Sequence, residues 1–209
     1  MTMVTEAKGS RRDRKQAALR ARIVSTAMDL FSRHGIANVT VDHIADVADI
    51  GKGTIYNYFQ AKEDILVAYM VDIERKVQVK VPDFEASKKP LAWILMEFLR
   101  FQFRLKKPYH NFVRVFLAQM FVRTAETLPY MMEMQKVIDP PIEHLFRGLQ
   151  ARKMIRGDLE IPSLIAAFKT LHLGLTAVWA IEGPPFRGTR QILRQEVQLF
   201  CEGITRKNS

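Results

Sequence analysis

The amino-acid sequence predicts an all-α protein, for three reasons. Apolar residues recur three and four positions apart along most of the 209 residues, which is the spacing that places them on one face of a helix. No stretch shows the alternation of apolar and polar residues that is typical of a strand. Glycine and proline separate the periodic segments, and the connections between these segments are short. The hydrophobic content of 48% indicates a chain that buries a core.

Residues 1–15 are predicted to form a flexible basic arm. In residues 1–22, seven lysine and arginine side chains oppose two acidic ones, so half of the formal net charge of +10 lies there. Such an excess favours a polyanionic partner, because each neutralised phosphate releases counterions. Basic arms of this kind reach a minor groove beside a DNA-reading helix, although a solvated tail is the alternative. The arginines expected to contact DNA are Arg11, Arg12 and Arg14.

The first helix is predicted to end at His34, because Gly35 follows the last residue of an apolar stripe. This stripe has helical spacing and consists of Ile23, Ala27, Leu30 and Phe31. It predicts one amphipathic helix before residue 40.

Residues 40–59 are predicted to form two short helices joined by a tight turn, which is the layout of a helix-turn-helix. Thr40 is placed to cap the first of these helices with its hydroxyl group. Asp49 stands at the turn, where a left-handed backbone is expected and where aspartate is tolerated better than a bulky or branched residue. The apolar positions of the first short helix are Ile44, Ala45 and Ala48.

The second short helix is predicted to begin after Gly51 and to bury Ile55 and Phe59, which are four residues apart. Its other face carries a cation, hydroxyl groups and an amide, which suit the phosphates and base edges of a major groove about 12 Å wide. Asn57 is the candidate base reader, since asparagine forms a paired hydrogen bond to adenine. The alternative is an ordinary helical hairpin whose tyrosines cover a core edge. The side chains of this face are Lys52, Thr54, Tyr56, Asn57 and Tyr58.

The first third of the chain resembles the DNA-binding domain of the TetR family of transcriptional repressors. The resemblance rests on two stretches, Ile23-x3-Ala27-x2-Leu30-Phe31-x3-Gly35-x4-Thr40-x3-Ile44-Ala45 and Gly53-Thr54-x-Tyr56-x-Tyr58-Phe59-x2-Lys62-Glu63-x2-Leu66. Similar proteins usually carry Gly at position 49 and often Ser at position 51, where this chain has Asp49 and Gly51. The resemblance implies a three-helix DNA-binding domain with a helix-turn-helix at residues 16–62. The DNA contacts expected there are Thr40, Lys52, Gly53, Thr54, Tyr56, Asn57, Tyr58 and Lys62.

Residues 63–209 are predicted to form a larger helical domain for ligand binding and dimerisation. A linking helix from Lys62 to about Lys80 is expected to stop at Pro82. Pro129 and the pair Pro140-Pro141 are expected to divide a later segment, for the same reason. The other predicted helices are residues 90–106, residues 108–121, a short one around residues 131–134, residues 142–154, residues 162–181 and residues 189–204.

Phenylalanine and methionine recur along four or five of these helices. Most are expected to be core, but methionine also fills adaptable binding surfaces, and the space between bundle helices is a usual ligand site. The resemblance implies such a site, because similar proteins bind a small molecule in their C-terminal helices and then release DNA. We therefore expect an apolar or aromatic effector that His172 hydrogen-bonds, with a satisfied core histidine as the commoner alternative. The candidate lining residues are Trp93, Met96, Phe101, Phe116, Met120, Met134, Phe168 and His172.

The last two predicted helices carry apolar stripes, and the first of them also offers small residues that let another helix approach closely. Two such helices from each of two chains make a four-helix interface, so a homodimer is expected. The alternative is that both stripes close the core of a single chain. The candidate interface residues are Leu164, Leu171, Leu175, Val178, Ile192, Val197 and Phe200.

Several other classes of protein are not supported by the sequence. The single cysteine, Cys201, excludes an internal disulfide and a cysteine-based zinc site, and no two of the five histidines are four residues apart. We assign no metal, cofactor or catalytic residue, since nucleophile and phosphate-loop motifs are absent. The most apolar segment, Leu91 to Met96, is followed directly by Glu97. It is therefore much shorter than the roughly 20 apolar residues of a membrane span, and no span is expected. The basic N-terminus lacks the apolar region of a signal peptide, so a cytoplasmic protein is expected.

The combined expectation is a sequence-specific DNA-binding transcriptional regulator, a repressor released from its operator by a small apolar or aromatic ligand. Its expected partners are double-stranded DNA, a second copy of the chain and the effector. A helical small-molecule-binding protein or enzyme is one alternative, but the sequence offers no acid/base or nucleophile cluster for it. An architectural protein that binds DNA without sequence preference is the other, and it leaves the aromatic-rich C-terminal two thirds unexplained.

Overall fold

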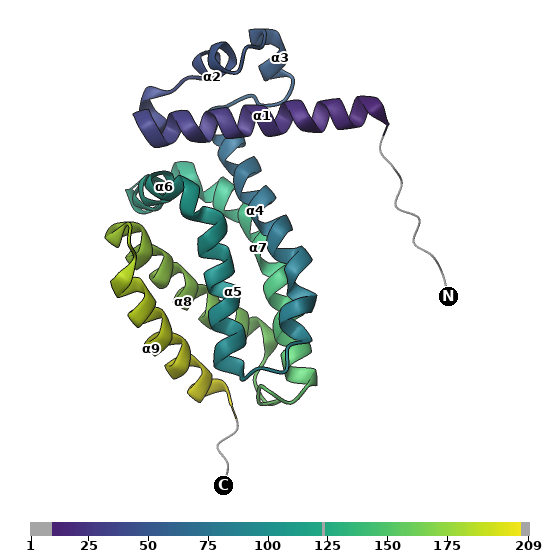
Figure 1. The fold of residues 1–209 in the computed structure, drawn as a ribbon, viewed down its shortest axis with the longest axis vertical. Helices are drawn as coiled ribbons and strands as arrows, with labels where there is room; N and C mark the ends of the chain where they lie inside the picture. Colours follow the sequence, from purple (N-terminus) through teal and green to yellow (C-terminus); the bar gives the residue numbers. More distant parts are fainter. Residues whose placement is uncertain (1–9, 123, 206–209) are drawn as a thin grey trace. The chain divides into compact units, whose positions relative to one another are not determined.

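The computed structural model describes residues 10–122 and 124–205, apart from the side chains of residues 115, 119–131, 133 and 134. Within these ranges all regular secondary structure is helical, which confirms the predicted fold class. The chain divides into two compact units, Met1–Ala68 (unit one) and Tyr69–Ser209 (unit two). The boundary falls inside the helix that was expected to link two domains, as the ribbon in Figure 1 allows the reader to follow.

Unit one contains α1 (Arg11–His34), the short 3-10 helix η1 (Ile36–Asn38), α2 (Val41–Val47), α3 (Lys52–Tyr56) and the start of α4 (Lys62–Glu85). Figure 1 shows α2 and α3 on the same side of the long helix α1, and α1 packs against α2. The apolar stripes predicted from helical spacing meet in one core. Its fully buried members include Ile23, Ala27, Ile44, Ala45 and Ile55.

Helix α1 begins at Arg11, within the segment of residues 1–15 that was predicted to be a flexible arm. The Ser10 hydroxyl accepts a hydrogen bond from the backbone N–H of Asp13 (3.1 Å), and the Asp13 carboxylate accepts one from the backbone N–H of Ser10 (2.8 Å). This capping box satisfies two N–H groups at the start of the helix. Residues 11–15 are therefore helical, while residues 1–9 lie outside the described residues.

Helix α4 continues through Pro82, so the break expected there was wrong. A proline inside a helix removes a hydrogen bond and costs roughly 3 kcal/mol. Packing in unit two offsets this cost, because Val81 is 1% exposed and the Phe84 ring meets the Phe98 ring edge to face at 5.6 Å. Burial of the last turn thus outweighs the local signal that proline gives.

Helix α7 (Thr124–Ala151) is also continuous, although Pro129 and the pair Pro140-Pro141 were expected to divide it. Proline fixes φ close to the helical value, so it weakens a helix without forcing the chain out of it when packing supports the next turn. The supporting stripe is at most 1% exposed and consists of Ile142, Leu145, Phe146 and Leu149. The separate short helix predicted around residues 131–134 does not exist.

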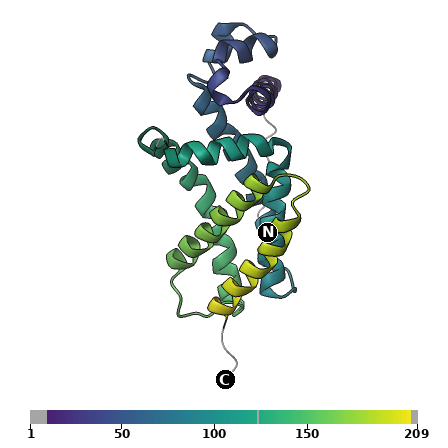
Figure 2. The same cartoon turned by 90° about the vertical axis from the view of Figure 1, so that its left-hand side faces the viewer.

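The remaining helices agree with the sequence prediction to within a few residues. They are α5 (Leu91–Lys106), the 3-10 helix η2 (Lys107–Tyr109), α6 (His110–Val122), α8 (Ile161–Glu182) and α9 (Arg187–Ile204). Within unit two, α8 packs against α6, α7 and α9, as Figure 2 shows from the side of α8 and α9. The core is aromatic, since the centroid of the Phe168 ring lies 5.2 Å from that of Phe146 and 5.9 Å from that of Phe98.

Among the described residues, α8 is the helix that is long and apolar enough to cross a membrane by length and composition, with a hydropathy of 1.6. The expectation of no membrane span was based on the segment from Leu91 to Met96 and did not consider this helix. Only 33% of the most apolar window is buried within the chain, against α6, α7 and α9. A helix with neighbours on one side and an uncovered apolar face on the other meets the requirement of a subunit interface.

Candidate DNA-binding surface and effector cavity

The helix-turn-helix has the local geometry expected from its sequence. Through Oγ1, Thr40 accepts a hydrogen bond of 3.1 Å from the backbone N–H three residues later, and so caps α2. Asp49 adopts a left-handed conformation at the turn, with φ of 51°. Gly51 is the extended N-cap of α3. The apolar side of α3 faces the core, since Ile55 is 0% and Phe59 is 4% exposed.

The outward side of α3 presents the polar groups that were predicted to contact DNA. Open space lies where a Cβ would stand at Gly53, so a phosphate can approach the backbone closely there. Lys52, Gly53, Tyr56 and Asn57 are exposed, while Thr54 and Tyr58 are half-buried. This side of the helix is therefore accessible to a ligand. Tyr56 is exposed, so it does not merely cover the edge of the core, which was the alternative.

One carboxylate that the sequence analysis did not single out, Asp42 in the first turn of α2, holds two of these groups. Lys52 Nζ lies 2.7 Å from Asp42 Oδ2, and the Tyr56 hydroxyl donates to Asp42 Oδ1 at 3.2 Å. The hydrogen bond between Lys52 and Asp42 lowers the pKa of Asp42 and raises the pKa of Lys52. Desolvation and then the bond to Asp42 raise the pKa of Tyr56. Both donors keep their protons at neutral pH and lie side by side.

Lys62, one of the predicted DNA contacts, forms hydrogen bonds within unit one. Its Nζ donates to the carbonyl oxygens of Ile36 (2.8 Å) and Val39 (3.3 Å). These hydrogen bonds tie the start of α4 to the segment before α2. Lys62 therefore stabilises the helix-turn-helix within unit one, and its contact with DNA stays a prediction.

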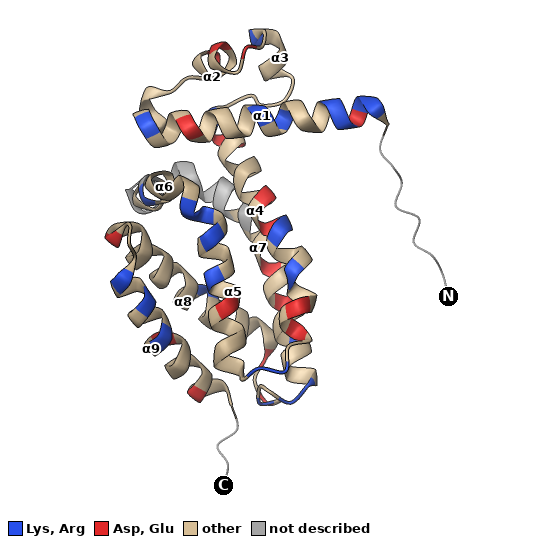
Figure 3. Cartoon of the chain, viewed as in Figure 1, with Lys and Arg blue, Asp and Glu red and all other residues tan. Residues whose placement is uncertain are grey.

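Arg11, Arg12 and Arg14 are exposed in the first turns of α1 and not in a flexible arm. Figure 3 shows this basic end of α1. Because α1 packs against α2, the helix fixes the reach of these three side chains within unit one. Their contact with a minor groove stays a prediction.

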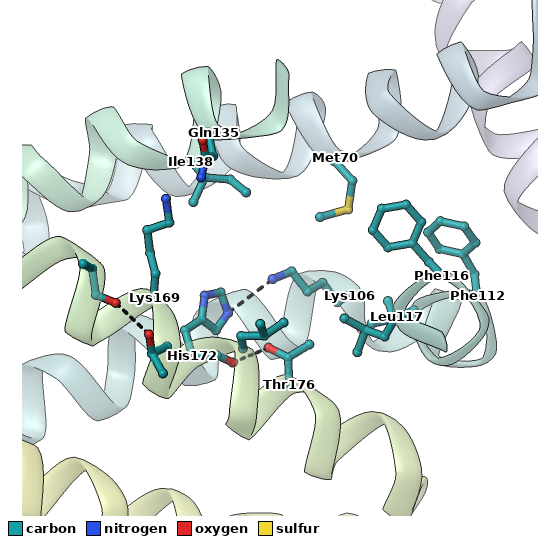
Figure 4. Close-up of a pocket in the computed structure, with 14 residues that line it drawn as sticks. Met70, Lys106, Phe112, Phe116, Leu117, Gln135, Ile138, Lys169, His172 and Thr176 are labelled. Atoms are coloured by element: carbon teal, nitrogen blue, oxygen red, sulfur yellow. Dashed lines mark hydrogen bonds between the residues drawn. The ribbon is translucent and has the colours of Figure 1, made fainter. Parts of the chain in front are cut away.

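Unit two contains a partly open cavity of about 450 Å³ between α4, α5, α6, α7 and α8. This volume lies within the range of about 300–1,000 Å³ that is usual for small-molecule sites. Figure 4 shows the cavity with its lining side chains. Most of the wall is apolar and includes Met70, Phe112, Phe116, Leu117, Ile138 and Leu173. The polar lining consists of Lys106, Gln135, Lys169, Thr170, His172 and Thr176.

The structure brings two of the predicted lining residues, Phe116 and His172, to this cavity. Phe168 instead is fully buried among other rings of the core. Trp93 is 40% exposed beneath the Lys89 ammonium. Met96 and Phe101 are also absent from the cavity wall, whereas the side chains of Met120 and Met134 lie outside the described residues. Helical spacing identifies a buried face, but it does not identify the neighbour that this face meets.

Buried polar groups gather around Lys106, which is only 4% exposed. Lys106 Nζ donates to Gln102 Oε1 (3.1 Å) and lies 3.4 Å from His172 Nε2. Burial, together with the charge of Lys106, lowers the pKa of His172 well below its usual range. Burial also lowers the pKa of Lys106 and raises the pKa of Glu74, whose charge acts on Lys106. Sequence analysis missed Lys106 because a lysine in the last turn of a helix is usually exposed.

A second cavity, of about 430 Å³, lies between α5, α8 and α9 and is basic. Glu97 lies 2.8 Å from Arg100 and 3.7 Å from Arg104, so these two cations share one carboxylate. The lining also includes Lys107 and Arg190. The surplus of positive charge favours an anionic group in this cavity.

The residues predicted to form the dimer interface are not the apolar residues that are most exposed on α8 and α9. Leu164, Leu175 and Val197 are at most 3% exposed and close the core of the chain itself, so their assignment to an interface was wrong. Leu171, Val178, Ile192 and Phe200 are half-buried. The apolar side chains that point outward from α8 and α9 are Leu173 (41% exposed), Ile181 (77%) and Leu199 (61%).

Within residues 10–122 and 124–205, no group of three or more histidine, cysteine, aspartate or glutamate side chains is placed to hold a metal ion. Cys201 is buried, and burial raises the pKa of its thiol to about 12. The thiol is thus protonated and packs as a small apolar side chain.

Comparisons with known proteins agree with the geometry of unit one. The model of the bacterial regulatory proteins of the tetR family matches residues 23–69. The HTH-type transcriptional regulator RutR of Escherichia coli (strain K12) is 28% identical over 110 residues, which are 53% of this chain and 51% of RutR. The HTH-type transcriptional regulator YhgD of Bacillus subtilis (strain 168) is 22% identical over 174 residues, which are 83% of this chain and 87% of YhgD. The chain thus spans about half the length of RutR.

Solved structures share the fold over most of the chain. The fatty acid degradation regulator FadR from Bacillus halodurans has a TM-score of 0.72 at 17% identity, over 90% of this chain and 97% of that one. Thermus thermophilus FadR, a TetR family transcriptional repressor solved in complex with lauroyl-CoA, has a TM-score of 0.67 at 20% identity, over 91% and 97% of the two chains. These TM-scores establish a common fold, and at identities this low they establish the fold alone.

Proposed function

The chain belongs, through its helix-turn-helix, to the tetR family of bacterial regulatory proteins, and we propose that it is a sequence-specific DNA-binding transcriptional regulator. The observation that carries the proposal is the outward side of α3, where Lys52 and Tyr56 are held by Asp42 opposite the buried Ile55. Donors at fixed positions on a short exposed helix suit phosphate oxygens and base edges in a major groove. Its relatives are regulators, so we place the chain with them and not among enzymes, and we expect it in the cytoplasm.

Footprinting on the DNA that flanks the chain's own gene tests this function, since similar repressors often act there. A protected site that survives excess competitor DNA at moderate salt supports a sequence-specific regulator. Uniform binding that the competitor abolishes would support an architectural DNA-binding protein instead.

We further propose that the regulator is a repressor whose effector occupies the cavity of unit two. Its apolar wall, its volume and its few polar groups support a small apolar or aromatic effector. The solved FadR structures from Thermus thermophilus and Bacillus subtilis hold lauroyl-CoA and stearoyl-CoA, so acyl-CoA compounds belong among the first effectors to test.

Helix α4 provides the route by which an effector acts on DNA binding. Lys62, at its start, holds the helix-turn-helix segment, and Met70, two turns later, lines the cavity. An effector changes operator occupancy only if it binds better to the conformation that fits the operator poorly. The proposal is that α4 shifts between two such conformations.

A thermal-shift screen of apolar compounds is expected to find ligands that stabilise the protein and release it from its operator. A ligand present at a hundred times its Kd adds about 2.7 kcal/mol to stability. Leu117→Trp fills part of the cavity and is expected to abolish this gain, while Val79→Trp, at a position that is 76% exposed, is the matched control. An apolar ligand that stabilises the Leu117→Trp variant as much as the original protein would contradict the site.

We also propose a homodimer, formed by the outward apolar side chains of α8 and α9. Ile181 and Leu199 are 77% and 61% exposed within one chain, and the interface would cover them. A second copy also accounts for the uncovered apolar face of α8 without a membrane.

Ile181→Asp and Leu199→Asp are expected to yield monomers with unchanged helix content, because each places an unpaired charge in the interface. Val79→Asp, which alters an exposed apolar residue on α4, is expected to leave the dimer intact. Light scattering gives the mass, and circular dichroism gives the helix content. Dimers of undiminished stability in both α8 and α9 variants would exclude this face.

A further inference from the structure

Lys106 stands out among the groups that line the effector cavity because it is a buried basic side chain in a mostly apolar wall. An ammonium group has three N–H donors. Gln102 Oε1, at 3.1 Å, accepts from one, and His172 Nε2, at 3.4 Å, is positioned to accept from a second. Figure 4 shows the end of the Lys106 side chain next to the His172 ring, with a dashed line between them. Among the side chains that the structure describes, no hydrogen-bond acceptor is recorded for the third donor, which is therefore open to a group inside the cavity.

The described side chains around the cavity do not provide Lys106 with a carboxylate in direct contact. Lys169, the other lysine in the wall, already has one, since its Nζ lies 2.7 Å from Asp139 Oδ1. Among the residues that the structure describes, no carboxylate lies within 4 Å of Lys106. Glu74 acts on Lys106 from a greater distance and is not part of the cavity wall. A buried charge is costly unless it is paired and hydrogen-bonded.

We propose that the effector is an amphipathic anion, with an apolar body and a carboxylate head that accepts a hydrogen bond from Lys106. This inference rests on the proposed effector site and names the chemical class of its ligand. The apolar body would contact Met70, Phe112 and Phe116, which form the wall beyond Lys106. A bond between ammonium and carboxylate is also stronger than one between neutral groups, so the head selects acids over alcohols of the same length.

The alternative is that Lys106 and Glu74 form a purely structural pair, which has no preference for the charge of a ligand. Saturated acids from hexanoic to tetradecanoic acid, with the matching alcohols, separate the two cases. Binding to the full chain is measured by calorimetry, and operator release is measured with the same compounds. We expect the best acid to bind about ten- to a hundredfold more tightly than its alcohol.

Variants test whether Lys106 is the source of this preference. Lys106→Met keeps the length of the side chain and is expected to bring the affinity for the acid down to that for the alcohol. Lys169→Met removes a cavity-lining lysine that is already paired, and is expected to retain most of the preference. Glu74→Gln removes the competing carboxyl group, so it is expected to bind the acid at least as tightly as the original protein does.

The outcomes separate this inference from the proposed function. Equal affinity for acid and alcohol in the original protein, or an equal preference in Lys106→Met, overturns the anionic head group while leaving an apolar effector in place. The anionic head group is also overturned if the original protein and Lys106→Met bind decanoyl-CoA equally tightly and neither prefers the free acid to the alcohol. Binding of neither acids, alcohols nor acyl-CoA compounds overturns both this inference and the effector site, whereas DNA binding would still stand.

Discussion

Replacement of Lys52 by Ala or of Tyr56 by Phe is expected to weaken operator binding about ten- to a hundredfold, the effect of losing one hydrogen bond to a charged group. Both side chains are exposed on α3, and both are positioned by Asp42. Neither contributes to the core, so helix content and thermal stability should change little. Lys52→Ala should also reduce the slope of log affinity against log salt by about one, because it removes a cation, whereas Tyr56→Phe should leave the slope unchanged.

The control for this pair is Lys88→Ala, which removes the same charge from an exposed position in unit two. Electrophoretic mobility shift at several salt concentrations measures affinity and salt slope together. If Lys88→Ala weakens binding as much as Lys52→Ala, the overall charge of the protein and not α3 determines DNA affinity. Unaltered affinity in both α3 variants would remove α3 from the interface.

Replacement of Phe168 by Ala is expected to destabilise the protein by about 3–5 kcal/mol, the usual cost of truncating a buried phenylalanine. The ring is fully buried, and its centroid lies 5.2 Å from that of Phe146, 5.9 Å from that of Phe98 and 5.8 Å from that of Phe200. Truncation leaves a void that these rings cannot fill completely. Denaturant unfolding is followed by the fluorescence of the two tryptophans, both of which belong to unit two.

Phe116→Ala is the matched variant, because this ring is half-buried and lines the effector cavity. It is expected to cost less stability than Phe168→Ala and to reduce effector affinity more. The reverse pattern would return Phe168 to the ligand site in which the sequence analysis placed it. The comparison therefore decides whether Phe168 packs the core or binds the ligand.

The sequence by itself determined the helix-turn-helix, because its signals are local. Asp49 takes the left-handed turn, Thr40 caps α2, and the spacing of Ile55 and Phe59 predicts which side of α3 is buried. Each depends on backbone preferences and side-chain spacing within a few residues, which any reader of the sequence can evaluate. The identity of the exposed polar side chains on α3 follows from the same spacing.

The boundaries of α4 and α7 were decided by tertiary structure. A proline carries the same local preference wherever it stands, and Pro82, Pro140 and Pro141 were expected to end or divide helices. Burial of the stripe around Phe146 and of Phe84 against Phe98 outweighs that preference. The energy of these contacts comes from residues distant in the chain, so no local pattern contains it.

Only the tertiary structure decided which side chains form the effector cavity. Trp93, Phe116 and Phe168 have similar apolar character in the sequence, yet one is partly exposed, one lines the cavity and one fills the core. Lys106 has the sequence environment of a solvated helix end, yet it is buried against His172, which is 66 residues away in the chain. A cavity is the space that several helices leave between them, so its lining depends on how they pack and not on the periodicity of any one helix.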